Sequence, residues 1–345
     1  MATIVGIDVG YGNTKAVWGT KYLNGQKQWN EICIKSVVNQ VFGDYGNDQI
    51  GGLDRVLVNV NENMYFVGPQ ATLAGGLSVS GYEYIETEQY EALICGALSY
   101  MMKSYGKVIT DIDILVLGLP ASSYNSKRKL LQKFGCKTRN VPIPVKLQNN
   151  TTTSVEVTAK HVFIIPQPYG AIRYAFEIDN NDDLFCDEFT AMVIDPGYST
   201  FDWFVTQGMK AQIELSDSFE GGVSVLLQNV ASCISKDYGD GMPNFGLIEK
   251  GLQNGYMHIA NKKISMDKYL NVIKQSADSI VSEFLRRFDP KKNGINKIIL
   301  AGGGASFFAN SLTQRLPNYK IETMSQSVMS NARGFWIHGN DMLPE

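Results

Sequence analysis

The segment of the chain best suited to bind a phosphate is IDVGYGNTK, residues 7–15. The apolar run 4–7 predicts a short buried β-strand, and residues 8–13 predict the tight turn that follows it. Gly10 and Gly12 would let backbone N–H groups approach an anion, Thr14 adds a hydroxyl and Lys15 a positive charge, and the Asp8 carboxylate suits a hydrated cation. These parts fit a phosphate with its magnesium ion. A structural hairpin turn stays open as the alternative, and neither the Walker nor the Gly-x-Gly-x-x-Gly pattern is present.

A second segment, VIDPGYSTFDW at residues 193–203, repeats the same arrangement. An apolar strand leads into Asp195, a Pro-Gly turn carries Ser199 and Thr200, and a second strand follows. Residues 195–198 (Asp-Pro-Gly-Tyr) thus echo residues 8–11 (Asp-Val-Gly-Tyr). The repetition predicts two lobes of similar plan.

Composition narrows the classes of function. The chain has 345 residues, 44% of them hydrophobic, which predicts two globular domains. Its 31 basic and 34 acidic residues nearly cancel, so neither nucleic acid nor an anionic membrane is expected as a direct ligand. Five scattered cysteines without a Cys-x-x-Cys pair, and no signal peptide or membrane-spanning run, favour a cytoplasmic protein. The three histidines have neither metal-ligand spacing nor a nucleophile motif, which disfavours zinc hydrolysis and triad chemistry.

Strand and helix patterns alternate along the chain and predict an α/β fold. Helical patterns lie at residues 88–106, 122–135 and 266–288, and apolar strands at 111–120, 189–205 and 297–301. A short helix is predicted within 327–339. The helix at 266–288 is expected to face the core with six residues at helical spacing: Leu270, Ile273, Ala277, Ile280, Phe284 and Phe288.

Five segments, taken in order, resemble the nucleotide-site motifs of the actin superfamily of sugar kinases, heat-shock chaperones and actins. The phosphate 1, connect 1, phosphate 2, adenosine and connect 2 motifs match residues 7–15, 164–176, 193–203, 299–310 and 331–336. Within the superfamily the chain is most similar to the ParM-like actins of bacterial plasmids and to archaeal actin-like proteins. Their Asp-x-Gly-Tyr-Gly-Asn-x-Lys, Gly-Leu-Pro and Asn-Ala-Arg-Gly motifs stand at residues 8–15, 118–120 and 331–334.

The resemblance implies two ribonuclease-H-like α/β lobes around a nucleotide cleft. The first lobe is expected at residues 1–165, with a C-terminal helix within 325–345 packing back on it, and the second at residues 166–324.

The same resemblance implies the roles of the site residues. Asp8 and Asp195 would hold Mg²⁺ largely through water, Lys15 would neutralise the β and γ phosphates of ATP, and Gln167 would position the attacking water. Gln167 and Asp195 are therefore the expected catalytic residues, and GTP stays open as an alternative nucleotide. Asp8 and Asp195 as turn-stabilising residues, and Gln167 as a structural amide, are the alternatives. The expected nucleotide contacts are Asp8, Gly10, Tyr11, Gly12, Asn13, Thr14, Lys15, Gly197, Tyr198, Ser199, Thr200, Glu220, Gly221, Gly222, Gly302, Gly303, Gly304 and Ala305.

One departure from the family pattern concerns the second turn. Pro196 and Tyr198 stand where many relatives have smaller or more flexible residues, which leaves fewer glycine-freed amides. The hydroxyls of Ser199 and Thr200 are expected to compensate.

The implied function is an ATPase that polymerises into filaments and separates plasmid copies. Its partners would be further copies of itself and a DNA-binding adaptor bound to the plasmid centromere, with no direct contact to nucleic acid or membrane. A sugar- or acetate-type kinase of the same fold is an alternative, although no acceptor-side acid or base was found for it. A nucleotide-switched scaffold or chaperone is a third possibility.

Overall fold

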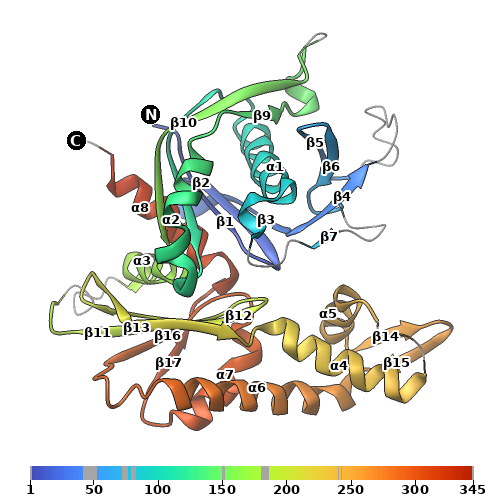
Figure 1. The fold of residues 1–345 in the computed structure, drawn as a ribbon, viewed down its shortest axis with the longest axis vertical. Helices are drawn as coiled ribbons and strands as arrows, with labels where there is room; N and C mark the ends of the chain where they lie inside the picture. Colours follow the sequence, from blue (N-terminus) through green and yellow to red (C-terminus); the bar gives the residue numbers. More distant parts are fainter. Residues whose placement is uncertain are drawn as a thin grey trace. The chain divides into compact units, whose positions relative to one another are not determined.

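The computed structural model describes residues 2–41, 53–71, 77–78, 83–149, 152–179, 186–239, 241 and 243–343. The chain divides into two compact units (Figure 1). The first comprises Met1–Asn180 with Met329–Glu345, and the second comprises Asn181–Val328. Each is an α/β unit built on its own sheet. No helix in the described ranges is long and apolar enough to cross a membrane.

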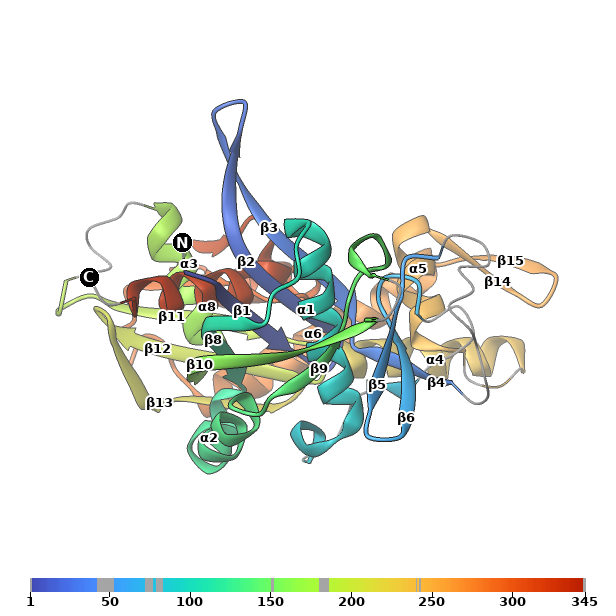
Figure 2. The ribbon, with the colours of Figure 1, turned by 90° about the horizontal axis from the view of Figure 1, so that it is seen from above.

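The first unit is built on a six-stranded sheet in the order β3-β2-β1-β8-β10-β9. Strands β1 (Ile4–Val9), β2 (Asn13–Leu23) and β3 (Gln26–Lys35) form an antiparallel meander, and the β2–β3 hairpin extends beyond the sheet (Figure 2). Strands β8 (Asp111–Leu119) and β10 (Ser154–Pro166) continue the sheet parallel to β1, and β9 (Arg139–Pro142) is an antiparallel edge strand.

Both faces of this sheet are covered. Alternate side chains of a strand point to opposite faces, so the residues of β1 fall into two separate cores. Val5 and Ile7 join the large core formed with α1 (Glu88–Tyr105) and α2 (Ala121–Gly135). Ile4 and Ile114 pack on the other face against Phe335 of α8 (Ser330–Asp341). The nearly continuous apolar sequence of β8 is explained by this two-sided burial.

Helix α8 packs tightly on α3 (Gln167–Asp179) and on β1. A Cβ on Gly334 would lie 1.7 Å from the carbonyl oxygen of Gly170, so the two helix backbones touch. The neighbouring Arg333 is buried, donates to both carboxylate oxygens of Glu31 at 2.7 and 2.8 Å, and also donates to the Tyr174 hydroxyl. The Asn-Ala-Arg-Gly motif therefore fixes the last helix to β3 and α3.

The boundary between the units differs from the expected one at residue 165. Helix α3 belongs to the first unit, and the boundary lies at Asn180. The physical reason is the backbone contact of α3 with α8 described above. Residues 325–345 form the 3-10 turn η4 (Ser327–Met329) and helix α8, and the last two residues lie outside the described ranges.

A smaller four-stranded sheet completes the first unit. Its order is β5-β6-β4-β7, with β4 (Val37–Val41), β5 (Val56–Val60), β6 (Asn63–Val67) and β7 (Leu77–Ser78). The 3-10 turn η1 (Tyr84–Glu86) leads into α1, and η2 (Val145–Leu147) lies between β9 and β10. Helix α1 lies against both β5 and β9 (Figures 1 and 2).

The second unit repeats the plan of the main sheet in the order β13-β12-β11-β16-β17. Strands β11 (Thr190–Pro196), β12 (Thr200–Gln207) and β13 (Lys210–Glu220) form an antiparallel meander, and β16 (Lys297–Leu300) and β17 (Ile321–Thr323) continue it parallel to β11. The similar plan predicted from the two Asp-containing turns is thus present in the sheet order of the two units.

In the described part of the second unit, four α-helices accompany this sheet: α4 (Val223–Tyr238), α5 (Phe245–Asn254), α6 (Asp267–Arg287) and α7 (Ala305–Arg315). A hairpin of β14 (Tyr256–Ile259) and β15 (Lys262–Ser265) follows α5. Five residues of the stripe predicted at 266–288 are buried, but Leu270 is 52% exposed, so its assignment to the core was wrong. The neighbouring Tyr269 is 1% exposed and takes the first place in the buried stripe of α6, so Leu270 lies beside that stripe rather than in it.

Candidate functional site

The first predicted phosphate turn is the connection between β1 and β2. The two strands pair so that Asp8 lies opposite Lys15 and Val9 opposite Thr14. The Gly10 amide donates to the Asn13 carbonyl at 3.1 Å and closes the turn. A Cβ on Gly10 would lie 3.2 Å from that same carbonyl oxygen, so a larger residue would crowd the turn.

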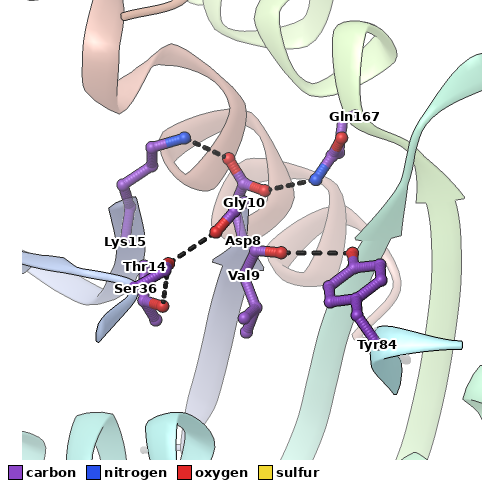
Figure 3. Close-up of polar contacts among 8 residues, drawn as sticks. All are labelled: Asp8, Val9, Gly10, Thr14, Lys15, Ser36, Tyr84 and Gln167. Atoms are coloured by element: carbon purple, nitrogen blue, oxygen red, sulfur yellow. Dashed lines mark hydrogen bonds and ion pairs between the residues drawn. The ribbon is translucent and has the colours of Figure 1, made fainter. Parts of the chain in front are cut away.

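Asp8 is the centre of the polar network at this turn (Figure 3). Its side chain is 1% exposed, and both carboxylate oxygens are engaged. Lys15 Nζ lies 2.8 Å from Oδ2, and Gln167 Nε2 donates to Oδ1 at 2.7 Å. Asp8, Lys15 and Gln167 come from β1, β2 and the first residue of α3, so the fold brings together three predicted site residues from the phosphate 1 and connect 1 motifs.

Gln167 reaches this position because neighbouring residues leave space for it. A Cβ on Gly118 would lie 3.0 Å from Gln167 Cγ and 2.2 Å from a ring carbon of Phe335. The Gly-Leu-Pro motif at the end of β8 therefore makes room for both the amide side chain and the last helix. The glycine supplies free volume next to the site rather than a ligand contact.

Two residues that the sequence reasoning did not predict support the turn from behind. The Ser36 hydroxyl donates to the Gly10 carbonyl and lies 2.8 Å from the Thr14 hydroxyl, while its amide donates to the Gly12 carbonyl at 3.0 Å. Tyr84 donates its hydroxyl to the Val9 carbonyl at 3.2 Å. Burial raises the pKa of Tyr84 well above its usual range, which keeps this donor protonated.

The aromatic ring of Tyr11 lies on this same support, with its centroid 4.8 Å from that of Tyr84. Thr14 is fully buried, and its hydroxyl is taken up by Ser36. In the described structure the Thr14 hydroxyl therefore stabilises the turn. The linear sequence offered no signal for Ser36 or Tyr84, because only the strand register and the position of η1 bring them to the turn.

The second predicted phosphate turn joins β11 to β12 in the second unit. The Gly197 amide donates to the Thr200 carbonyl at 2.8 Å, in the same way that Gly10 closes the first turn. The Thr200 hydroxyl donates to an Asp202 carboxylate oxygen at 2.5 Å. Burial raises the pKa of Tyr198 to about 12, so its phenol is neutral at physiological pH.

The carbonyls of this turn are capped by the start of α4. The amides of Gly221 and Gly222 donate to the Ser199 carbonyl at 3.2 and 3.0 Å, and the next two amides donate to residues 197 and 198. A Cβ on Gly222 would lie 2.4 Å from the Tyr198 carbonyl oxygen. The segment after Glu220, the last residue of β13, therefore holds the turn in shape, and its contact with a nucleotide stays a prediction.

Asp195 lies at the end of β11 and is 6% exposed. Gly302, in the turn between β16 and α7, has φ +79°, and a Cβ there would lie 2.0 Å from Asp195 Oδ1. Gly304 donates its amide to the Pro196 carbonyl at 2.9 Å, and Ala305 begins α7 as a buried residue. The adenosine and phosphate 2 motifs are thus packed against each other, whereas Gly303 is exposed.

The two Asp-containing hairpins differ in the residue that faces the aspartate. Asp8 lies opposite a lysine, but Asp195 lies opposite Asp202, which is 4% exposed. Side chains directly opposite each other in an antiparallel pair lie on the same face. The second hairpin thus presents two buried carboxylates on one face, and Asp202 is a candidate site residue that the sequence reasoning missed.

Comparison with known proteins agrees with this architecture. The model of the N-terminal domain of actin-like proteins matches residues 6–170, and the model of the C-terminal domain of the archaeal MreB-like actin homologue matches residues 193–314. No curated protein sequence shows significant similarity to this chain.

Solved structures of similar fold come from actin-like proteins. A ParM from a 15-stranded filament of Clostridium botulinum superposes with a TM-score of 0.79 at 19% identity, covering 99% of each chain. The archaeal actin homologue Ta0583 in complex with ADP gives 0.74 at 19% identity over 98% of this chain and 99% of that one. Actin-like protein Alp7A gives 0.69 at 14% identity over 99% and 97%.

The chain therefore has the actin fold. The two family models together match most of the chain and identify it as an actin-like protein of the actin superfamily.

Proposed function

We propose that the protein is a magnesium-dependent ATPase whose nucleotide state controls its polymerisation into filaments. The observation that carries the proposal is the arrangement around Asp8, a buried carboxylate that Lys15 and Gln167 hold at the end of β1. A hairpin that served only as a turn would not require a buried carboxylate, an ammonium and an amide to converge at its base.

The residues of both units fit a nucleotide with its magnesium ion. The first turn offers Lys15 to phosphate oxygens and Asp8 to a hydrated cation. The second hairpin adds the paired carboxylates Asp195 and Asp202, an oxygen donor set that Mg²⁺ prefers. Bound magnesium would neutralise charge on the β and γ phosphates.

Lys15 would exchange partners when the nucleotide binds. In the described structure its ammonium is paired with Asp8, and a polyphosphate offers more negative charge to the same group. Transfer of Lys15 to the phosphates would leave one Asp8 oxygen available to the water shell of the cation. The residue would then bind phosphate as a mobile point charge rather than through a fixed geometry.

Gln167 would orient the water that attacks the γ-phosphorus. An amide is too weak a base to take a proton at physiological pH, so its contribution would be positioning, as in other phosphoryl-transfer enzymes that use a glutamine. Its hydrogen bond to Asp8 keeps the side chain at the phosphate turn.

The test of the chemistry compares Gln167→Ala with Gln132→Ala. Gln132 is an exposed residue of α2 whose amide also donates to a backbone carbonyl, that of Val162 at 3.3 Å, so the control loses a similar bond outside the site. Phosphate release without any acceptor should fall by about a hundredfold or more in Gln167→Ala, with nucleotide affinity nearly unchanged. Normal release in that variant would refute the role, and release that requires an added acceptor would favour a small-molecule kinase.

The assembly part of the proposal is supported by similarity to a ParM filament at 19% identity. Head-to-tail contacts that do not close produce a helical filament, and a nucleotide can drive assembly only if the polymer binds its two states differently. Segregation of plasmids through a separate DNA-binding adaptor is the use we propose. With ATP or a non-hydrolysable analogue the protein should sediment above a critical concentration, and a protein that stays monomeric with both would refute polymerisation.

A further inference from the structure

A cavity lies in the first unit, away from Asp8 and Gln167. It has a volume of about 800 Å³ and lies between the C-terminal half of α1, the β5–β6 hairpin and the connection from β9 to β10. Strands β5 and β9 are the outer strands of their two sheets, and both lie against α1 (Figures 1 and 2). Pockets of about 300–1,000 Å³ that are largely apolar with a few fixed polar groups are typical sites for small molecules.

The walls of this cavity are mainly apolar. Leu57 and Phe66 come from the small sheet, and Ile143, Val145 and Leu147 come from the β9–β10 connection. Val145 is 54% exposed, so this apolar surface is open to solvent. A ligand with an apolar body would remove that surface from water, which is favourable at roughly 25 cal/mol per Å².

Arg55 places a positive charge in the lining of the cavity. Its guanidinium lies over the Phe66 ring, 3.7 Å from the centroid, and has no hydrogen bond or ion pair with the side chains of the described residues. Among the described residues, three other arginines are not exposed, and each of them has a carboxylate partner: Arg139, Arg173 and Arg333. A stacked guanidinium with unused N–H groups is well suited to bind a carboxylate or another oxyanion in a bidentate manner.

The remaining charges of the cavity do not neutralise Arg55. The one acidic lining residue of the described chain is Asp54, and it is already bound by Lys103 Nζ at 2.9 Å and the Tyr100 hydroxyl at 3.2 Å. Lys146 adds another positive charge at the edge. The cavity therefore carries a net positive charge next to apolar walls.

The helical wall contributes an unpaired hydroxyl. Ser99 of α1 lines the cavity, is 1% exposed, and its Oγ has no hydrogen-bond partner among the described residues. Other helical serines of this chain, such as Ser232 and Ser276, donate to the carbonyl four residues earlier. The buried Ser311 hydroxyl of α7, outside the cavity, also has no partner among the described residues, so the assignment of a ligand rests on Arg55 and the apolar walls.

From these observations we infer that the cavity binds a small amphipathic anion, with an apolar body against Leu57, Phe66 and Val145 and a carboxylate or sulfonate on Arg55. Such a ligand would connect the small sheet to the main sheet of the first unit. Because β4 of the small sheet begins directly after Ser36, which supports the phosphate turn, the cavity is joined by a short path to the nucleotide site. The binding itself does not depend on the proposed ATPase activity.

The experiment titrates the full chain with anilinonaphthalene sulfonate (ANS), a fluorescent apolar anion, in the presence of saturating ADP and magnesium. We expect one saturable class of bound ANS, displaced by laurate. Arg55→Gln should raise its dissociation constant about tenfold or more, since a charge-assisted bidentate contact is lost. Arg55→Lys should give a smaller increase, because the charge stays but the planar fork is lost.

The matched control is Arg128→Gln, which removes an exposed guanidinium that also lies over an aromatic ring, that of Tyr124, outside the cavity. This variant should bind ANS as the unchanged protein does. Circular dichroism and urea unfolding should show Arg55→Gln folded, since its side chain is not part of a buried ion pair. Unchanged ANS affinity in Arg55→Gln, an equal loss in both variants, or no saturable class at all would each overturn the assignment.

Discussion

Replacing Gly302 by alanine tests whether the adenosine motif holds the Asp195 carboxylate in place. Gly302 has φ +79°, in the left-handed region that favours glycine, and its added Cβ would lie 2.0 Å from Asp195 Oδ1 and 3.0 Å from the Pro196 carbonyl oxygen. The next residue provides a matched control, because a Cβ on Gly303 would meet only a side-chain carbon of Val328 at 3.7 Å, an ordinary contact.

The expected magnitude has two parts. The left-handed conformation costs alanine about 1–2 kcal/mol relative to glycine. Forcing a methyl group into the packed contact with Asp195 costs about 1–3 kcal/mol more, because the carboxylate or the turn must move. Gly302→Ala should therefore lower the free energy of unfolding by about 2–5 kcal/mol, whereas Gly303→Ala should change it by less than about 0.5 kcal/mol.

Urea unfolding followed by circular dichroism measures the stabilities, and calorimetric titration with Mg²⁺-ADP measures the binding. Gly302→Ala should weaken magnesium-dependent binding, because the added methyl group displaces the Asp195 carboxylate, which is one of the proposed cation ligands. Gly303→Ala should bind normally if the triple glycine acts through Asp195. Equal losses in the two variants would refute this reasoning and would indicate that the whole Gly302–Gly304 backbone contacts the nucleotide.

Three further outcomes follow from the packing and the charges. Gly334→Ala should lower the melting temperature strongly, because its Cβ would lie 1.7 Å from the Gly170 carbonyl oxygen and helices α3 and α8 would have to separate; an unchanged melting curve would contradict the backbone contact. Burial lowers the pKa of His338 below its ordinary 6.5, so the unfolded chain binds the proton at a higher pH than the folded one, and stability should fall as the pH drops through about 6.5. His338→Gln should reduce this fall when urea midpoints are measured against pH. Midpoint curves that run parallel for the variant and the unchanged protein would contradict the prediction. Asp202→Asn should raise the magnesium concentration needed for nucleotide binding, because it removes the charge opposite Asp195; an unchanged magnesium titration would exclude a role for Asp202.

The sequence predicted the architecture well where hydrophobic period and turn chemistry agree. The two strand–Asp–Gly turns predicted a repeated plan, and the sheet orders β3-β2-β1-β8-β10 and β13-β12-β11-β16-β17 contain that repeat. The boundary between the units could not be placed, because the contact that assigns α3 to the first unit joins Gly170 to Gly334 across a long stretch of sequence. Leu270 was misplaced because Tyr269 and Leu270 both lie at helical spacing from Ile273, and the structure buries Tyr269.

The candidate site was predictable only in its sequence-local parts. Asp8 and Lys15 are seven residues apart, and the hairpin register alone places them opposite each other. The support from Ser36 and Tyr84 depends on where β3 ends and where η1 lies, and no local sequence motif predicts either position. Asp202 was missed for a different reason. It lies within the matched phosphate 2 segment, but only the strand register shows that its carboxylate lies opposite Asp195.

The first unit is made of two separate segments of the chain, and this affects how the protein can fold as it is synthesised. The second unit is one continuous segment, whereas the first needs residues from 329 onward to complete it. After residue 180 has been synthesised, the face of β1 and β8 that carries Ile4 and Ile114 stays without Phe335 until the second unit and residue 335 have followed, on the order of ten seconds or more at about 5–20 residues per second. A released chain that ends at Val328 should show protease resistance in the second unit and not in the first. The first unit, most of which is translated before the second, would then be completed after it, with an apolar sheet face available to chaperones during the interval.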